Sequence, residues 1–166
     1  AAAIASLAAA SACGGGGTPA ALIIYEAHTA GVVNIFTIDP TTASSKQITH
    51  GDAFDGNPAW SPDRKHIIFS SNRNQEDVRM NEILLMDTDG RNVRNLTNTE
   101  KGSEWSPKYS PDGARISYAV ATGAGAYHLG LMDADGSNQQ NVAGPYRFVE
   151  FPSWTRDGRE VFFSAI

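Results

Sequence analysis

Asn57-Pro58-Ala59-Trp60-Ser61-Pro62-Asp63 decides the fold of this chain, because related stretches occur twice more. The second is Ser106-Pro107-Lys108-Tyr109-Ser110-Pro111-Asp112-Gly113, and the third is Phe151-Pro152-Ser153-Trp154-Thr155-Arg156-Asp157-Gly158. The first prolines of the three copies are 49 and then 45 residues apart. A period in the forties with strand-like content is typical of the blades of a β-propeller.

A second marker keeps the same spacing. Asp39, Asp87 and Asp133 are 48 and then 46 residues apart, and the last two open the turns Asp87-Thr88-Asp89-Gly90 and Asp133-Ala134-Asp135-Gly136. We therefore predict an all-β chain, an incomplete β-propeller of four-stranded antiparallel blades with about three blades and part of a fourth. The expected blades cover approximately 20–55, 56–104, 105–149 and, incompletely, 150–166.

The second unit shows how a blade is expected to form. Ser61-Pro62-Asp63 predicts a tight turn, because proline fixes φ and the Ser and Asp side chains bond local backbone. Asp89-Gly90 supplies the positive φ of a hairpin. We expect the four strands at 59–60, 65–70, 82–86 and 93–97. In the first unit, 22–25, 33–38 and 46–49 match strands two to four, so the innermost strand is missing and the chain is expected to be a piece of a longer propeller.

The residues shared by the copies are expected to be structural. Trp60, Tyr109 and Trp154 recur at one position, which favours core packing between adjacent blades over ligand binding. The other repeat residues are the prolines and turn aspartates Pro58, Asp63, Pro107, Asp112, Pro152 and Asp157. Two copies depart from the pattern: Arg64 replaces the turn glycine, and Arg156 replaces the turn proline.

The composition allows a buried core and disfavours one class of partner. The chain is 41% hydrophobic and 19% charged, and its net charge is −5. An acidic chain without basic runs is not expected to bind nucleic acid.

The first 17 residues are expected to be a leader and tether outside the propeller. Residues 1–12 are apolar and alanine-rich, and Ala10-Ser11-Ala12-Cys13 is similar to a bacterial lipobox, with Ala10 where that motif usually has Leu. Four glycines follow Cys13, which suits a flexible tether. We expect Cys13 to carry a lipid that anchors an exported protein to a bacterial membrane, in the periplasm or at the cell surface. An ordinary signal peptidase site and an alanine-rich leader with an incidental cysteine are the alternatives.

The aromatic-Ser-Pro-Asp-Gly turn followed by Met-Asp-x-Asp-Gly resembles the WD-like repeats of TolB-type β-propellers. The resemblance runs from Leu22 to the end of the chain and implies a secreted bacterial propeller that binds other envelope proteins. The same repeat also occurs in propellers attached to serine peptidases.

No enzyme motif accompanies the repeats. The sequence contains no Gly-x-Ser-x-Gly, no His-Glu-x-x-His and no phosphate loop, and its four histidines do not cluster. The paired aspartates lack the later ligands of a calcium loop, so hairpin turns are expected there. We predict no catalytic residues, no metal and no cofactor.

Two functions compete on the sequence. The first is a non-enzymatic scaffold that binds a protein or peptide in the cell envelope. The second is the amino-terminal propeller of a prolyl-oligopeptidase-like serine peptidase, whose catalytic domain would lie outside this chain. A propeller lyase or sugar-binding enzyme has no marker here.

We expect a partner to bind where the long, irregular connections lie. In an up-and-down blade the two tight turns share one end, and the connections between strands two and three and between blades share the other. The predicted connections are 50–57, 71–81, 98–105, 121–127 and 144–150. They carry aromatic and arginine residues of the types enriched in interfaces: Phe54, Arg73, Trp105, Tyr127, Tyr146 and Arg147.

Lipidation of Cys13 is directly testable. We expect the chain, expressed in a bacterium behind a start methionine and a basic segment, to incorporate a palmitate analogue, because the lipobox-like stretch directs a lipid to that thiol. The Cys13→Ala variant should incorporate none. Equal labelling of the two chains contradicts the prediction.

Overall fold

The computed structural model describes residues 21–29, 31–73, 80–99, 102–122 and 125–166. These residues form strands and no helix, which confirms the all-β prediction. The strands are β1 (Ile23–Thr29), β2 (Val32–Ile38), β3 (Ser45–Gln47), β4 (Asp55–Trp60), β5 (His66–Ser71), β6 (Glu82–Asp87), β7 (Arg94–Asn95), β8 (Gly102–Tyr109), β9 (Arg115–Thr122), β10 (Ala126–Asp133), β11 (Gln140–Tyr146), β12 (Val149–Trp154) and β13 (Val161–Ala165).

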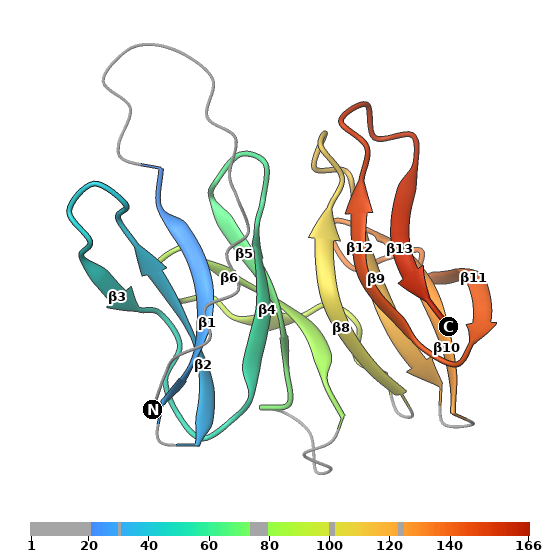
Figure 1. The fold of residues 1–166 in the computed structure, drawn as a ribbon, viewed down its shortest axis with the longest axis horizontal. Helices are drawn as coiled ribbons and strands as arrows, with labels where there is room; N and C mark the ends of the chain where they lie inside the picture. Colours follow the sequence, from blue (N-terminus) through green and yellow to red (C-terminus); the bar gives the residue numbers. More distant parts are fainter. Residues whose placement is uncertain (1–20, 30, 74–79, 100–101, 123–124) are drawn as a thin grey trace.

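The strands form four antiparallel sheets that stand side by side in chain order (Figure 1). Sheet A is β1-β2-β3, sheet B is β4-β5-β6-β7, sheet C is β8-β9-β10-β11, and sheet D is β12-β13. Each sheet runs up and down between nearest neighbours, as a propeller blade does. The prediction of an incomplete propeller is therefore confirmed. Cys13 and the leader lie outside the described residues.

The same hydrogen bonds close the first tight turn in sheets B, C and D. Ser61 Oγ donates to Asp63 Oδ1 at 2.6 Å, and His66 N donates to Ser61 Oγ at 3.0 Å. The side-chain bond recurs at 2.6 Å in the pairs Ser110–Asp112 and Thr155–Asp157. In each turn the hydroxyl lowers the pKa of the aspartate, which therefore stays ionised at neutral pH. Arg64 takes the turn's left-handed position with φ of 61°, where the other two turns have glycine.

In sheets B, C and D the first strand is longer than the sequence predicted. Strand β4 begins at Asp55 and not at Ala59, because the strand passes through the repeat proline as a β-bulge. The residue before that proline has positive φ in all three copies: 51° at Asn57, 54° at Ser106 and 53° at Phe151. Proline has no N–H for the ladder, so a bulge is where a strand accommodates it. The predicted connections 50–57, 98–105 and 144–150 therefore end within strands.

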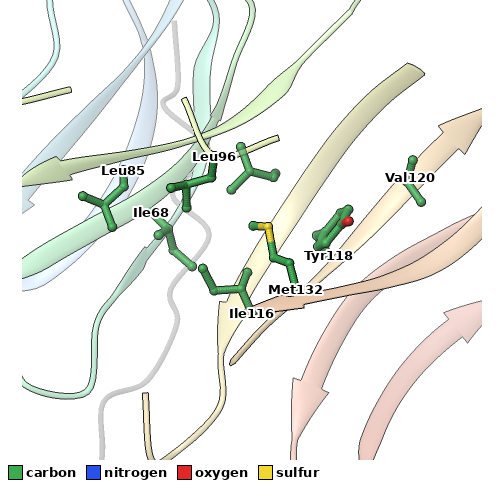
Figure 2. Packing of buried hydrophobic residues seen from close by; sticks show 8 residues of the cluster. Ile68, Leu85, Leu96, Ile116, Tyr118, Val120 and Met132 are labelled. Atoms are coloured by element: carbon green, nitrogen blue, oxygen red, sulfur yellow. The ribbon is translucent and has the colours of Figure 1, made fainter. Parts of the chain in front are cut away.

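Sheet B is buried on both faces, because its residues alternate between two hydrophobic clusters. Ile67 and Phe69 pack against sheet A with Ile24 and Ile35. Ile68 lies between them in sequence and packs the other way, against sheet C. Figure 2 shows this second cluster, with Ile68, Leu85 and Leu96 of sheet B facing Ile116, Tyr118, Val120 and Met132 of sheet C. All of Ile67, Ile68 and Phe69 are 0% exposed.

The recurrent aromatic residues lie between sheets. Trp60 packs on the cluster between sheets A and B, and Tyr109 on the cluster between sheets B and C. Trp154 Nε1 donates to the carbonyl oxygen of Lys108, in the first strand of the preceding sheet, at 3.2 Å. Trp60 Nε1 is buried without a partner among the described residues, where sheet A has no counterpart of that strand.

The face of sheet D that points away from sheet C is uncovered in the described chain. Phe162 is 64% exposed, whereas Ile68, at the same position of sheet B, is 0% exposed beneath sheet C. Phe162 therefore presents an apolar side chain on the face that, in sheet B, contacts the next sheet.

The hairpin glycines allow neighbouring sheets to approach closely. Gly136 has φ of 93°, and a Cβ there would lie 2.7 Å from the carbonyl oxygen of Leu96 in sheet B. Gly125 has φ of 71°, but a Cβ there would meet nothing within 4 Å.

We expect Gly125→Ala to lower the free energy of unfolding by about 1 kcal/mol, because alanine is strained at a positive φ. Gly136→Ala should lower it by roughly 1–3 kcal/mol more, because the sheets must also move apart. Urea denaturation of both variants measures the difference, and equal losses would contradict the close approach.

Candidate functional site

The six residues predicted to meet a partner lie at one end of the sheets, opposite the tight turns. At this long-loop end β5, β9 and β11 finish, and β4, β8 and β12 begin (Figure 1, bottom). Phe54 precedes β4, Arg73 follows β5, Trp105 lies in β8, Tyr127 lies in β10, Tyr146 ends β11, and Arg147 follows it.

Aromatic side chains meet one another at the long-loop end of sheet C, and one of these contacts extends to sheet D. Trp105 and Tyr127 meet edge to face, with ring centroids 5.7 Å apart, and the Phe148 centroid lies 5.6 Å from that of Tyr127. Tyr146 meets Phe163 of β13 at 5.8 Å. Sequence reasoning missed Phe148 and Phe163, which it assigned to a connection and to a strand. The aromatic group is therefore partly packed, and Tyr146 remains 37% exposed.

Arg73 is held in an ion pair. Its prediction as a partner-binding residue assumed a side chain that projects freely, and that assumption is wrong. Its Nη2 lies 2.6 Å from Asp55 Oδ2, and its side chain is 25% exposed while that of Asp55 is 1% exposed. Ser71 Oγ also donates to Asp55 Oδ1 at 2.6 Å. The guanidinium lies over the ring of Phe69, 5.3 Å from its centroid. Arg73 thus compensates a buried carboxylate, and removing it would leave that charge unpaired.

Glu104 occupies in sheet C the position of Asp55 in sheet B, at the start of the first strand. It is 1% exposed and accepts a hydrogen bond from Thr99 Oγ1 at 2.9 Å. Glu82, whose charge acts on Glu104, accepts a hydrogen bond from Thr99 N at 2.9 Å. Burial, and next the charge of Glu82, raises the pKa of Glu104 to about 8. Among the described residues Glu104 forms no ion pair, unlike Asp55, and its Oε2 has no hydrogen-bond partner.

The paired aspartates form hairpin turns, as predicted. Asp87 accepts a bond from Asn92 Nδ2 at 2.7 Å, and Asp133 accepts one from Asn138 Nδ2 at 2.6 Å. Backbone N–H groups two residues on bond to Asp89 and Asp135. In the described part of the chain, no three His, Cys, Asp or Glu residues are grouped to hold a metal ion. The long-loop end thus carries a group of aromatic side chains and the exposed Arg147.

Comparisons with known protein sequences find bacterial relatives. No protein-family model matches the chain. An uncharacterized protein of Agrobacterium fabrum is 28% identical over 140 residues, covering 78% of this chain and 46% of that protein. The uncharacterized peptidase YuxL of Bacillus subtilis is 31% identical over 126 residues, covering 76% of this chain and 18% of the peptidase. The chain therefore spans under half the length of either relative.

Solved structures agree on the fold. A TolB-like protein from Agrobacterium tumefaciens superposes with a TM-score of 0.73 at 21% identity, over 87% of this chain and 55% of that one. TolB from Acinetobacter baumannii gives 0.70 at 23% identity, over 84% and 34%. Puromycin hydrolase gives 0.67 at 15% identity, over 87% and 23%.

The chain is thus a partial β-propeller of the TolB type of fold. That fold is shared by TolB proteins and by the propellers of peptidases. Within the described residues, no helix has the length and apolar character needed to cross a membrane.

The raised pKa of Glu104 predicts a pH dependence of stability. Its folded-state pKa lies above the unfolded value of 4.5, so folding favours the protonated form. That stabilisation is complete below pH 4.5 and is lost as the pH rises toward 8. Because one pKa unit corresponds to about 1.4 kcal/mol, we expect the wild type to lose on the order of a few kcal/mol between pH 5 and pH 8 relative to Glu104→Gln. Urea denaturation of both chains at the two pH values measures it. A pH-independent difference between them would refute the assignment.

Proposed function

We propose that this chain is part of an exported β-propeller that binds a protein or peptide in the cell envelope through its long-loop end. A lipid on Cys13 would hold it to a bacterial membrane. The observation that carries the proposal is the aromatic group of Trp105, Tyr127, Phe148 and Tyr146 at that end, with the exposed Arg147 beside it. Tyr, Trp and Arg are the residues that most often dominate binding energy at protein interfaces.

The differences between blades support the long-loop end over the tight-turn end for recognition. The tight turns repeat the same side-chain hydrogen bond in three sheets, so the turns themselves are similar from blade to blade. The long-loop end differs in each sheet: Arg73 and Asp55 pair in sheet B, and aromatic rings meet in sheets C and D. Specific recognition needs such distinct groups.

The TolB-like fold neighbours and the lipobox-like leader support the envelope setting. In this proposal the chain contributes binding and no catalysis.

A peptidase propeller is the second candidate, favoured by the similarity to YuxL and to puromycin hydrolase. In that case the long-loop or tight-turn end would face a hydrolase domain encoded after Ile166. The gene sequence beyond Ile166 decides between the two. A Gly-x-Ser-x-Gly within about 300 codons supports the peptidase, and further Ser-Pro-Asp-Gly repeats followed by a stop codon support the binding protein.

Docking at the long-loop end can be tested by site-specific crosslinking. We expect a photoreactive phenylalanine analogue at Tyr146 to crosslink an envelope protein in living bacteria. The same analogue at Val93, which is 36% exposed beside the tight-turn end, should not. The affinity of the purified captured protein for the chain should then fall at least tenfold in Tyr146→Ala/Arg147→Ala, because both side chains are exposed at the proposed interface.

The matched control removes an exposed apolar residue and an exposed arginine from the other end. Val93→Ala/Arg91→Ala should leave the affinity unchanged, since the Arg91 side chain is 82% exposed away from the interface. Crosslinks from Val93 with none from Tyr146, or a loss of affinity in the control alone, would place the interface elsewhere.

A further inference from the structure

A hollow of about 430 Å³ opens between sheets B and C at the tight-turn end. Its wall includes Asp63 and His66 of sheet B and Tyr109, Asp112, Gly113 and Asp135 of sheet C. It lies at the opposite end of the sheets from the surface proposed above and does not depend on that proposal.

At the two neighbouring sheet interfaces, an arginine of the chain lies over the recurrent aromatic ring. Between sheets C and D, the Arg115 guanidinium lies 4.9 Å from the Trp154 centroid and donates to the carbonyl oxygen of Gly158 at 3.2 Å. Between sheets A and B, the Arg64 guanidinium lies 5.3 Å from the Trp60 centroid and donates to the carbonyl oxygen of Leu22 at 3.2 Å.

The hollow lies at the equivalent position of the interface between sheets B and C, where the side chains are smaller than those between sheets C and D. The turn hydrogen bonds fix the equivalence, since Ser110 N donates to Arg115 O just as Ser61 N donates to His66 O. At the interface between sheets B and C, His66 therefore occupies the position that Arg115 has between sheets C and D. Tyr109 likewise occupies the position of Trp154. Gly113 is the counterpart of Gly158. No arginine of the described residues lies over the Tyr109 ring as Arg115 lies over that of Trp154.

The charge around the hollow favours a cation. Hydrogen bonds from Ser61, Ser110 and Ser137 lower the pKa values of Asp63, Asp112 and Asp135, so these carboxylates are ionised at neutral pH. Burial raises the pKa of Tyr109 to about 12, which keeps its ring neutral. Three carboxylates and one guanidinium, that of Arg94, line the hollow, and Lys65 and Arg115 act on Asp63 and Asp112 from outside the lining.

We propose that this hollow binds an arginine side chain of a protein partner. The guest guanidinium stacks on Tyr109 among Asp63, Asp112 and Asp135, as Arg115 of the chain itself stacks on Trp154 one blade along. A planar guanidinium combines stacking with forked hydrogen bonding, which a lysine ammonium cannot do.

Methyl NMR of the whole chain tests the proposal, because Leu85 and Ala134 line the hollow. The probe is acetyl-Gly-Arg-Gly-amide, and its matched control carries citrulline, which has nearly the same shape without the charge. We expect the arginine peptide to shift the Leu85 and Ala134 methyl signals saturably and to bind at least tenfold more tightly than the citrulline and lysine peptides. Equal shifts from arginine and citrulline peptides, or no shift at either methyl, would overturn the proposal.

Two variants separate this site from nonspecific attraction of a cation. His66→Arg/Tyr109→Trp rebuilds the filled interface seen between sheets C and D, so it should abolish the shifts while the melting temperature stays equal or rises. Arg94→Ala removes the competing positive charge from an exposed side chain and should tighten binding at least twofold. Undiminished binding to a folded His66→Arg/Tyr109→Trp chain, or weaker binding to Arg94→Ala, would each refute the site.

Discussion

Sheet B is apolar on both faces, and a neighbouring sheet covers each of them. In β5 the residues Ile67, Ile68 and Phe69 point alternately to sheets A and C, and all three are fully buried. A strand that is apolar on both faces is not stable in an isolated sheet, because both of its apolar faces would meet water. The side-by-side order of sheets A, B and C follows from this constraint, and Phe162 is exposed on the face of sheet D that no described sheet covers.

Close stacking of sheets also governs the turns. Glycines at the hairpins let the backbone of one sheet reach the carbonyl groups of the preceding one, as Gly136 reaches Leu96. The Ser-Pro-Asp turns satisfy their own polar groups through Ser-to-Asp hydrogen bonds, so they need little from their surroundings. The backbone of these turns can therefore repeat from sheet to sheet while single side chains around it change.

Those variations are where function can arise. One buried position at the start of the first strand holds Asp55 with an arginine, Glu104 without one among the described residues, and the apolar Val149. One inter-sheet position holds two tryptophans and a tyrosine, and the tyrosine borders the hollow. A propeller thus gains local chemistry by changing one copy of a repeat without disturbing the others.

The sequence by itself determined the blade repeat, the tight turns, the hairpins and the inter-sheet aromatic residues, because each depends on local backbone preferences or on a recurring position. It did not reveal the bulge before each repeat proline, because a bulge is defined by pairing with a second strand. Nor could it pair Arg73 with Asp55, 18 residues away, or place Tyr127 between Trp105 and Phe148. The hollow beside Tyr109 depends on the volumes of side chains from two sheets, and only their packing in three dimensions decides which gaps stay open.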